Sequence, residues 1–599
     1  MAKRIDGMEL DRLLAGVEKP ARYIGGEYNS IIKDDAFLRW ALCFPDVYEI
    51  GMSHLGSRIL YHIVNALPET ACERVFAPWP DMEQALRDAG VPLFTLETKR
   101  PLADCDVIGF SLLYEMCYTN ILSMLALSGL PLRAEARTED MPLVVAGGPC
   151  ACNPAPVAAF FDAFLIGDGE ELIVECSEAL REAKRGGLCR AEKLRRLAAI
   201  PGVLVPSLAG DCGGPVVRRV VRDLNAVPFT GEPVVPFLGI VHDRVALEVM
   251  RGCTRGCRFC QAGYIYRPAR ERDCDSLLAF AGHQVDCTGY DEVSLLSLST
   301  GDYSRVHQLI PAIMEQMEQK RVSVSLPSLR VDAALREDLR VMRSVRKSGL
   351  TFAPEAGTQR LRDVINKNVT EEDVLSAAGD AFRAGWNAVK LYFMIGLPTE
   401  TDEDVLGIPA LTRKILALYY ALPKEERGKS PRLTVSVSTF VPKPFTAFQW
   451  CAQNPPEEIR RKQALLRGAF QGMRGVQLNC HFSSVSVLEA AFSRGDGRLS
   501  AVIERAYALG CRMDAWTEHF RGDLWERAFA ECGLSAADYA ERAYAPDEPL
   551  PWDGLDMLVT KRYLQREYRR AMAGDVTPDC RTRCGGCFGN EHADACGLS

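Results

Sequence analysis

Residues 251–260 read RGCTRGCRFC, and this stretch decides how the rest of the chain is interpreted. Its cysteines, Cys253, Cys257 and Cys260, have the spacing C-x3-C-x2-C, and an aromatic residue, Phe259, precedes the last of them. Thiolates this close can hold three corners of a [4Fe-4S] cluster, which leaves the fourth iron free to bind a substrate or a cofactor. A zinc knuckle normally needs a fourth Cys or His nearby. The next cysteine, Cys274, does not lie at zinc spacing, so zinc and chance are the weaker alternatives.

The cysteine stretch lies near the start of an α/β segment that runs from about 244 to 445. Short apolar runs alternate there with amphipathic patterns that predict helices, one of them from about Thr370 to Gly385. Repeated βα units of this length are typical of a barrel, whose chemistry takes place at the C-terminal ends of the strands. The six predicted strands are 245–250, 292–296, 322–326, 349–353, 388–393 and 433–438.

The cysteine stretch and the following Gln261-Ala262-Gly263 resemble the cluster loop of the radical S-adenosylmethionine (SAM) superfamily. The resemblance implies that the open iron binds the amino and carboxylate groups of SAM, and that reduction of the cluster splits a C–S bond and releases a 5′-deoxyadenosyl radical. It also implies a partial, TIM-like (β/α)6 barrel over residues 241–445 and a low-potential electron donor of the flavodoxin or ferredoxin type.

Polar residues and glycines follow three of the predicted barrel strands, where the resemblance implies contacts with SAM. The stretch after 292–296 corresponds to the part that holds the SAM amino group, and Glu355 is placed to accept from a ribose hydroxyl. The turn after 388–393 corresponds to the adenine-side loop, which Phe259 would also contact. Each match alone is weak, because a glycine after a strand is usually a turn and Glu355 could cap the next helix. The residues are Ser299, Thr300, Gly301, Asp302, Glu355, Gly396 and Pro398.

Residues 1–185 also alternate strand and helix patterns and are expected to form a Rossmann-like domain of the flavodoxin type. Strands are predicted at 38–44, 106–111, 143–148 and 163–167, and helices at 55–66 and 117–128. Ligands of such sheets bind at the carboxyl ends of the strands, where glycine lets the backbone approach a ligand closely. The residues predicted there are Ser111, Gly147, Gly148, Gly167 and Gly169.

This N-terminal segment resembles the cobalamin-binding domain that precedes the barrel of many radical SAM enzymes. The Gly-Gly-Pro turn at 147–149 and the Gly-Asp-Gly-Glu turn at 167–170 carry the resemblance, which implies that cobalamin is a cofactor. The motif Asp-x-His-x-x-Gly of cobalt-ligating domains is not matched around His54, so a cobalamin without a histidine ligand is expected. An empty domain that recognises substrate or packs on the barrel is the alternative.

The remaining domains are a connector at 186–240, rich in Pro and Gly, and a mainly helical region at 446–575. Helices are predicted at 499–509, 524–532 and 558–572, and a further strand at 475–479. The last helix is basic, which indicates a solvated face or, less favoured, a contact for an anionic substrate. Its basic residues are Lys561, Arg562, Arg566, Arg569 and Arg570. His481 is expected to be structural rather than an acid–base group at the barrel mouth.

A second cysteine group lies in the polar, glycine-rich tail at 576–599. Cys580, Cys584 and Cys587 repeat the C-x3-C-x2-C spacing, and Cys596 or His592 could be a fourth ligand. So dense a group in such a tail is not core packing. Thiolates suit both zinc and iron–sulfur clusters, so the ligand type leaves both open.

Composition limits the class of protein. The chain is 47% hydrophobic and 25% charged, which is typical of a globular protein. It has no apolar run long enough to span a membrane and no signal-peptide pattern, so we expect a cytoplasmic protein. Clustered cysteines among the 22 then indicate metal rather than disulfides. A net charge of −8 does not indicate a broad grip on nucleic acid, although a local basic site is compatible with it.

Nearly the whole chain resembles a largely uncharacterised bacterial group of radical SAM proteins with an N-terminal cobalamin-binding-like domain. Stretches 44–51, 73–79 and 577–581 carry that resemblance. The leading hypothesis is a radical SAM enzyme in which the substrate radical takes a methyl group from methylcobalamin or rearranges. One alternative is a cobalamin-independent radical SAM enzyme that modifies RNA by methylthiolation or sulfur insertion. The other is a non-catalytic iron–sulfur redox or binding protein. The substrate, the atom modified and the oligomeric state are not specified by the sequence.

Overall fold

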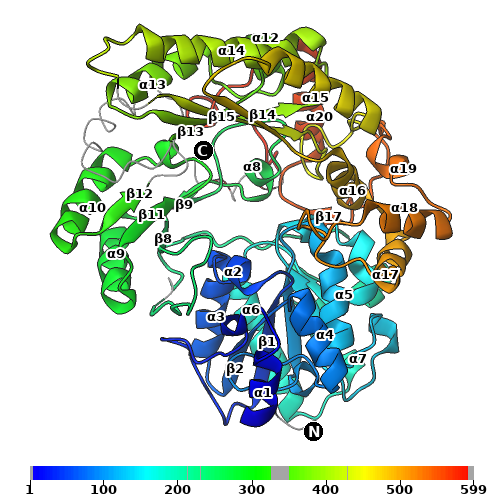
Figure 1. Cartoon of the computed structure of the whole chain (residues 1–599). Helices are drawn as coiled ribbons and strands as arrows, with labels where there is room; N and C mark the ends of the chain where they lie inside the picture. Colours follow the sequence, from blue (N-terminus) through cyan, green and yellow to red (C-terminus); the bar gives the residue numbers. More distant parts are fainter. Residues whose placement is uncertain are drawn as a thin grey trace. The chain divides into compact units, whose positions relative to one another are not determined.

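The computed structural model divides the chain into two compact units, each assembled from separate stretches (Figure 1). Unit 1 consists of Met1–Asp243, Phe492–Ala536 and Pro549–Met557. Unit 2 consists of Arg244–Ala491, Ala537–Glu548 and Leu558–Ser599. The structure describes residues 5–211, 214–228, 231–325, 350–427, 430–590, 592 and 596.

Unit 1 is built on one six-stranded sheet with the order β2-β1-β3-β4-β5-β6. The first five strands are parallel, and β6 pairs antiparallel with β5. The strands are β1 (Leu38–Phe44), β2 (Thr70–Phe76), β3 (Val107–Ser111), β4 (Leu143–Gly147), β5 (Ala163–Leu165) and β6 (Val203–Leu204). All four strands predicted in this region are present, and β6 extends the sheet beyond residue 185.

Strand β2 was not among the strands predicted from the sequence pattern. It is buried along most of its length although it contains Glu73 and Arg74. Arg39 of β1 donates to Glu73 at 2.8 Å, and Arg74 forms ion pairs with Glu27 and Glu97. Because these partners neutralise the charges inside the domain, a charged strand can occupy an edge of the sheet while lacking the apolar run of a buried strand.

Helices of unit 1 come from both ends of the chain. Helices α3 (Leu55–Ala66) and α6 (Gly169–Arg185) pack together against the sheet and share its main apolar cluster. Helix α5 (Tyr118–Leu127) packs against α17 (Leu499–Leu509), which in turn contacts α18 (Gly522–Glu531). The C-terminal stretch at 492–536 is therefore part of the N-terminal α/β unit.

Unit 2 contains two parallel sheets among its described residues. The first has the order β12-β11-β8 and the second the order β13-β14-β15-β16. The strands of the first are β8 (Val245–Glu248), β11 (Glu292–Leu296) and β12 (Ser323–Ser325). Those of the second are β13 (Leu350–Glu355), β14 (Ala388–Ile395), β15 (Arg432–Thr439) and β16 (Val476–Cys480). All six predicted strands are present; the predicted ends at Leu326 and Gly349 lie outside the described residues.

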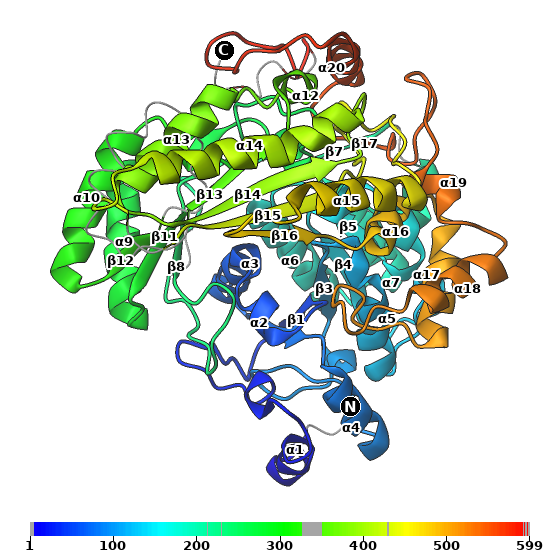
Figure 2. The same cartoon turned by 45° about the horizontal axis from the view of Figure 1, so that its top comes forward.

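Helices line the sheets of unit 2 as expected for βα units. Helices α13, α14 and α15 pack side by side along one face of the four-stranded sheet (Figure 2). Their bounds are Glu371–Arg383, Asp402–Ala421 and Pro456–Phe470. Helices α9 (Cys274–Thr288) and α10 (Val306–Lys320) pack against the three-stranded sheet. Thr370 caps α13 through a capping box with Asp373, which confirms the predicted start.

The region 446–575, expected as one mainly helical domain, does not form a compact unit of its own. Its strand β16 pairs with β15 and enlarges the sheet of unit 2, whereas residues 492–536 and 549–557 belong to unit 1. Within the described part of the chain, no helix has the length and apolar character needed to cross a membrane.

Candidate functional site

The cysteine loop of unit 2 begins where β8 and the short strand β9 (Met250–Arg251) end. Gly252 has φ +84°, and a Cβ there would lie 2.5 Å from the carbonyl oxygen of Pro268, so only glycine fits this turn. The loop ends at helix α8 (Ala262–Ile265). Its three cysteines are all partly exposed. The sequence therefore places three partly exposed cysteines a few residues beyond the end of the parallel strand β8.

Cys260 of this loop accepts a backbone hydrogen bond and is desolvated. The backbone N–H of Gly263 donates to Cys260 Sγ at 3.4 Å, as hydrogen bonds to cluster-bound sulfur do. Desolvation raises the pKa of the Cys260 thiol to about 12, so iron has to displace a proton when it binds. In the described part of the chain, no three His, Cys, Asp or Glu side chains are grouped so as to hold a metal ion. In a four-iron cluster, each thiolate binds a different iron and the ligands lie further apart.

Asp302 is the predicted strand-end residue that contacts the cysteine loop. The turn Thr300–Asp302 follows β11, and the side chain of Ser299 donates to Asp302 at 2.7 Å. Arg255, which lies between Cys253 and Cys257, donates through Nε to Asp302 at 3.0 Å. Ser299, Thr300 and Asp302 are buried. The stretch predicted to hold the SAM amino group is thus fixed beside the cysteines.

Glu355 lies at the end of β13 in an unusual backbone conformation. Its φ is +67°, and the pairing of β13 with β14 shifts register between Phe352 and Glu355. A non-glycine residue in this region costs about 1–3 kcal/mol, and such strain is common at functional sites. Glu355 accepts from Lys367 Nζ at 3.1 Å, and the charge of Lys367 acts to lower the pKa of Cys260. Lys367, which the sequence pattern did not reveal, therefore connects the carboxylate electrostatically with the cluster loop.

The predicted adenine side also comes together in unit 2. Phe259 of the cysteine loop packs against an apolar cluster that includes Leu397, the residue between Gly396 and Pro398. Gly396 has φ +82°, and its N–H donates to Glu400 at 2.8 Å. Glu400 is in turn paired with Lys462 at 2.7 Å. The turn after β14 is thus held by a buried ion pair, and its apolar side faces the same cluster as Phe259.

A fully buried arginine within the cysteine motif anchors the loop. The side chain of Arg258 donates to the carbonyl oxygen of Val364 at 3.0 Å and to Glu567 of α20 (Lys561–Ala573) at 3.2 Å. It also donates to the carbonyl oxygen of Asp575 at 2.7 Å. Asn366 donates to the carbonyl oxygen of Gly256 at 3.0 Å and completes the support. The pattern C-R-F-C contained Arg258, but nothing local in the sequence indicated its partners.

The tail cysteines belong to the same unit, and Cys580 and its neighbour Asp579 contact the same loop. The side chain of Asp579 accepts from Thr254 Oγ1 at 2.8 Å and forms an ion pair with Arg255, whose Nε lies 3.0 Å away. The N–H of Cys580 donates to the carbonyl oxygen of Thr254 at 3.2 Å. Cys587 is buried, Cys584 is exposed, and Cys580 and Cys596 are partly exposed. The two cysteine groups, which are separated by more than 300 residues in sequence, are therefore joined directly.

Other predicted residues of unit 2 have ordinary contacts. His481 is exposed, and its backbone N–H and carbonyl are bonded to Val437 and Gln463. The basic side chains of α20 donate mainly to backbone carbonyls, such as Lys561 to Glu548 and Arg570 to Val576. Neither His481 nor this helix lies in a contact that assigns it a chemical role.

The strand ends of unit 1 are engaged mostly by the chain itself. A Cβ at Gly148 would lie 2.7 Å from the carbonyl oxygen of Leu112, and one at Gly167 would lie 2.2 Å from that of Arg219. A Cβ at Gly147 would lie 3.2 Å from the carbonyl oxygen of Leu165, and one at Gly169 would lie 3.2 Å from the side chain of Leu60. The hydroxyl of Ser111 lies 3.2 Å from that of Ser57. These contacts explain the glycines by packing inside the domain. Cobalamin remains a prediction for this unit.

His54 serves as the N-cap of helix α3. Its Nδ1 accepts from the backbone N–H of Ser57 at 3.1 Å. Burial lowers the pKa of His54 to about 4, so the imidazole is neutral at neutral pH. With Nδ1 used in this way, His54 has a structural role, in line with the mismatch to the cobalt-ligating motif.

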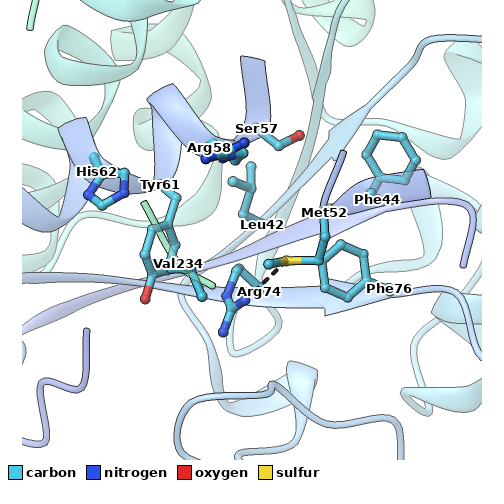
Figure 3. A pocket seen from close by; sticks show the side chains of 11 residues that line it. Leu42, Phe44, Met52, Ser57, Arg58, Tyr61, His62, Arg74, Phe76 and Val234 are labelled. Carbon is cyan, nitrogen blue, oxygen red and sulfur yellow. Dashed lines mark hydrogen bonds between the residues drawn. The ribbon is translucent and has the colours of Figure 1, made fainter. Parts of the chain in front are cut away.

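A small cavity lies between α3 and the sheet of unit 1 (Figure 3). Tyr61 and His62 line it from α3, and Arg74 from β2 donates to Met52 Sδ at 3.2 Å. Its volume of about 20 Å³ has room for roughly one water molecule. The cavity is too small for SAM or a corrinoid.

Comparison with known families and structures adds independent findings. Residues 56–206 match the family model "Radical SAM proteins, N-terminal", and residues 247–409 match "Radical SAM superfamily". The uncharacterized protein MJ0966 of Methanocaldococcus jannaschii is 31% identical over 465 residues, which cover 78% of this chain and 90% of the relative. A tRNA-2-methylthio-N(6)-dimethylallyladenosine synthase of Lachnoclostridium phytofermentans is 23% identical over 184 residues, or 29% of this chain and 39% of that enzyme.

Two solved structures are more distant. The radical SAM methyltransferase TsrM of Kitasatospora setae, with cobalamin and a [4Fe-4S] cluster bound, is 14% identical with a TM-score of 0.47. It matches 89% of this chain and 99% of TsrM. The cobalamin-dependent radical enzyme OxsB is 14% identical with a TM-score of 0.43, over 62% of this chain and 51% of OxsB. Both likenesses are too low to assign a cofactor or a reaction.

The family assignment therefore rests on the sequence matches and on the loop geometry described above. The second family model begins within β8 and includes the cysteine loop and the strand ends of β11, β13 and β14. The 31% identical relative extends the match to most of the chain. This chain belongs to the radical SAM superfamily.

Proposed function

We propose that the chain cleaves SAM reductively at the cysteine loop of unit 2 and uses the radical to activate a substrate. When bound, the cluster supplies the electron that splits SAM into methionine and a 5′-deoxyadenosyl radical, which then abstracts a hydrogen atom. The observation that carries the proposal is the convergence on one loop of residues from the ends of β11 and β13. Arg255 bonds Asp302, and Lys367 bonds Glu355 beside Cys260.

The chain's own residues position the reactants. Cys253, Cys257 and Cys260 would hold three irons. Ser299, Thr300 and the backbone at Gly301 would accept the SAM amino group, whose positive charge Asp302 favours. Glu355 would accept from a ribose hydroxyl, with Lys367 holding its carboxylate in place. Phe259 and the turn Gly396 to Pro398 would pack on adenine and exclude water from it.

The fold is compatible with this assignment. We infer that unit 2 is a partial barrel, because βα units with parallel strands carry all the contacts at the C-terminal ends of their strands. We infer that unit 1 is a doubly wound domain of the flavodoxin type, because its strand order begins 2-1-3-4-5. Cobalamin-dependent methyl transfer is the finer hypothesis from the resemblance, and no step of the present proposal goes through cobalamin.

A second candidate function is RNA modification by methylthiolation. The observation that favours it is the second cysteine group, together with the partial match to a methylthio-tRNA synthase. Against it, the match covers only 39% of that enzyme, and the net charge is −8. Incubation with SAM and total tRNA, followed by mass spectrometry of the nucleosides, distinguishes the two functions by the presence or absence of a methylthio product.

The proposal is tested by the products of SAM. Protein reconstituted without oxygen and reduced with dithionite should convert SAM to 5′-deoxyadenosine and methionine. Cys257→Ala should abolish both products, because the cluster loses one of its three ligands. Cys287→Ala is the matched control, since Cys287 is also partly exposed and lies in α9 outside the loop. Deoxyadenosine formation that persists in Cys257→Ala would reject the assignment.

A further inference from the structure

Asp579 and Cys580, at the start of the tail cysteine group, contact the SAM-cluster loop in ways that the proposed reaction does not require. Asp579 is held by Thr254 and Arg255, and the N–H of Cys580 bonds the carbonyl oxygen of Thr254. Thr254 and Arg255 are the residues between Cys253 and Gly256. A single hydrogen bond therefore joins Cys580, the first cysteine of the tail group, to the residue that follows Cys253.

Buried contacts upstream fix the tail in this position. The N–H of Thr577 donates to Asn366 at 2.7 Å, and Asn368 donates to the carbonyl oxygen of Thr577 at 3.0 Å. Arg258, between Cys257 and Phe259, reaches the carbonyl oxygen of Asp575. Thr577 is buried. Because both cysteine groups depend on the same buried residues, their separation is set by the fold and not by a flexible linker.

A buried arginine provides an independent indication of negative charge at the tail. Two nitrogens of the Arg267 side chain donate to carbonyl oxygens of the first loop region, Nε to Gly263 at 2.9 Å and Nη2 to Arg255 at 2.8 Å. Its Nη1 is buried and has no hydrogen-bond partner in the described part of the chain. The guanidinium also lies over the rings of Tyr264 and Tyr563. Because a buried N–H without an acceptor is costly, the surroundings of Nη1 favour an anionic group.

The groups that act on Arg267 identify where that anion belongs. Burial lowers the pKa of Arg267, but electrostatic interaction with Tyr563, Cys587 and Cys580 raises it overall. Thiolates bound to metal would carry such charge permanently. Cys596 also acts electrostatically on Cys580, in line with its predicted place as the fourth cysteine of this group.

We propose that Cys580, Cys584, Cys587 and Cys596 hold a second [4Fe-4S] cluster that delivers electrons to the SAM cluster. The C-x3-C-x2-C spacing is the one that binds the first cluster, which favours iron–sulfur over zinc. With four cysteines, all four irons have a protein ligand, and none is free to bind substrate. The first cluster differs because its three cysteines leave one iron open for SAM.

The exposure of the tail cysteines indicates where an electron enters the protein. Cys584 is exposed, so a reduced flavodoxin- or ferredoxin-type donor can approach the tail. One electron passes from this donor to the second cluster and then to the first, where it is consumed as SAM becomes methionine and the deoxyadenosyl radical. This role rests on the proposed function, whereas the site itself does not.

Metal content and spectroscopy test the site. Wild-type protein reconstituted with iron and sulfide should contain about eight irons, four for each cluster. The double variant Cys584→Ser, Cys587→Ser should lose about half of the iron, and Cys257→Ala should keep the electron paramagnetic resonance signal of the tail cluster. Cys189→Ser, at an exposed cysteine of unit 1, is the control with unchanged iron. Wild-type protein with one equivalent of zinc and no iron lost in the double variant would overturn the proposal.

A substitution at Arg267 and assays with flavodoxin as the electron donor test the role of the second cluster. Arg267→Gln should shift the midpoint potential of the second cluster to more negative values, because a positive charge beside an anionic cluster favours its reduced state. Arg562→Gln, at an exposed position of α20, should leave the potential unchanged. With flavodoxin as reductant, the tail double variant should lose deoxyadenosine formation; full activity with flavodoxin would overturn the relay. Wild type with both clusters but no deoxyadenosine would instead reject the proposed function and leave the site standing.

Discussion

The carboxyl ends of the strands in unit 1 and in unit 2 are used in opposite ways. In unit 1, the residues after β1 and β3 bond with the chain's own C-terminal stretch. Asp46 accepts from Trp516 at 2.9 Å, Asp514 accepts from Thr119, and Asn120 bonds the backbone of Met513. In unit 2, the residues after β11 and β13 contact the cysteine loop. A doubly wound sheet offers a ligand crevice at its switch point, and here residues 513–516 bond with the segments that follow β1 and β3.

Glycine and polar residues after a strand do not by themselves indicate a ligand. Gly167 and Gly252 both have positive φ, and a Cβ at either would meet a backbone carbonyl. Gly167 accommodates the neighbouring residue Arg219, whereas Gly252 opens the loop that carries three thiols. The two turns differ in the residues that come after the glycine. Cysteine spacing is therefore a stronger indication of a ligand site than a glycine at positive φ.

Loss of the buried Arg258–Glu567 pair in unit 2 should have the strongest effect on stability. Arg258→Met should lower the free energy of unfolding by about 3–5 kcal/mol, because it leaves the carboxylate of Glu567 buried without its partner. Arg562→Met at an exposed position should change it by less than about 0.5 kcal/mol. Denaturant unfolding monitored by tryptophan fluorescence measures both. A further Glu567→Gln substitution should recover part of the loss, and equal stability of Arg258→Met and wild type would contradict the expectation.

The next effect concerns a buried carboxyl of unit 1. Burial raises the pKa of Asp514 to about 6, above its ordinary value in the unfolded chain. The folded state therefore binds a proton that the unfolded state releases, so the free energy of unfolding should fall as pH rises from about 4 to about 6. The full change is on the order of 3 kcal/mol.

Asp514→Asn tests this linkage, because asparagine can still bond with Thr119 and Trp525 but cannot ionise. The free energy of unfolding, measured at several pH values across this range, should depend less on pH for Asp514→Asn than for wild type. An unchanged slope would show that Asp514 does not titrate in this window.

The two glycines form a matched pair that contrasts the strand ends of the two units. Gly167→Ala and Gly252→Ala should each destabilise the protein by about 1–3 kcal/mol, because alanine is strained at positive φ and would clash with a carbonyl. Gly252→Ala alone should also lower the iron content and deoxyadenosine formation, since it displaces the cysteine loop. If Gly167→Ala lost iron to the same extent, the strand ends of the two units would not be functionally separate.

Ser111 should give the weakest effect of this series. Ser111→Ala removes the contact with Ser57 and should cost about 1 kcal/mol in stability. The resemblance predicts that protein made with cobalamin supplied carries an equimolar corrinoid, measured by its absorbance. If wild type carries corrinoid and Ser111→Ala loses it, the strand ends of unit 1 hold a cofactor after all. Absence of corrinoid from wild type would make unit 1 a recognition or structural domain.

Local features were predicted well from the sequence. The strand at 38–44 and the helices at 55–66 and 499–509 match β1, α3 and α17 residue for residue. Hydrophobic periodicity, caps and glycines act over a few residues, so they specify such elements directly. Strand β2 was not predicted, because its charges are neutralised by Glu27, Glu97 and Arg39, which are distant in sequence.

The superfamily was predicted from the resemblance of the cysteine loop to a known family. Spacing and periodicity in the sequence were enough to specify the three-cysteine loop and the parallel strands that lead to the site, because these signals are local. The folded chain was needed to reveal that Asp579 and Cys580 contact Thr254, that Lys367 pairs with Glu355, and that residues 492–536 join the first unit. These contacts connect segments up to several hundred residues apart. They depend on side-chain packing and on the pairing of buried charges, which no short stretch of sequence encodes.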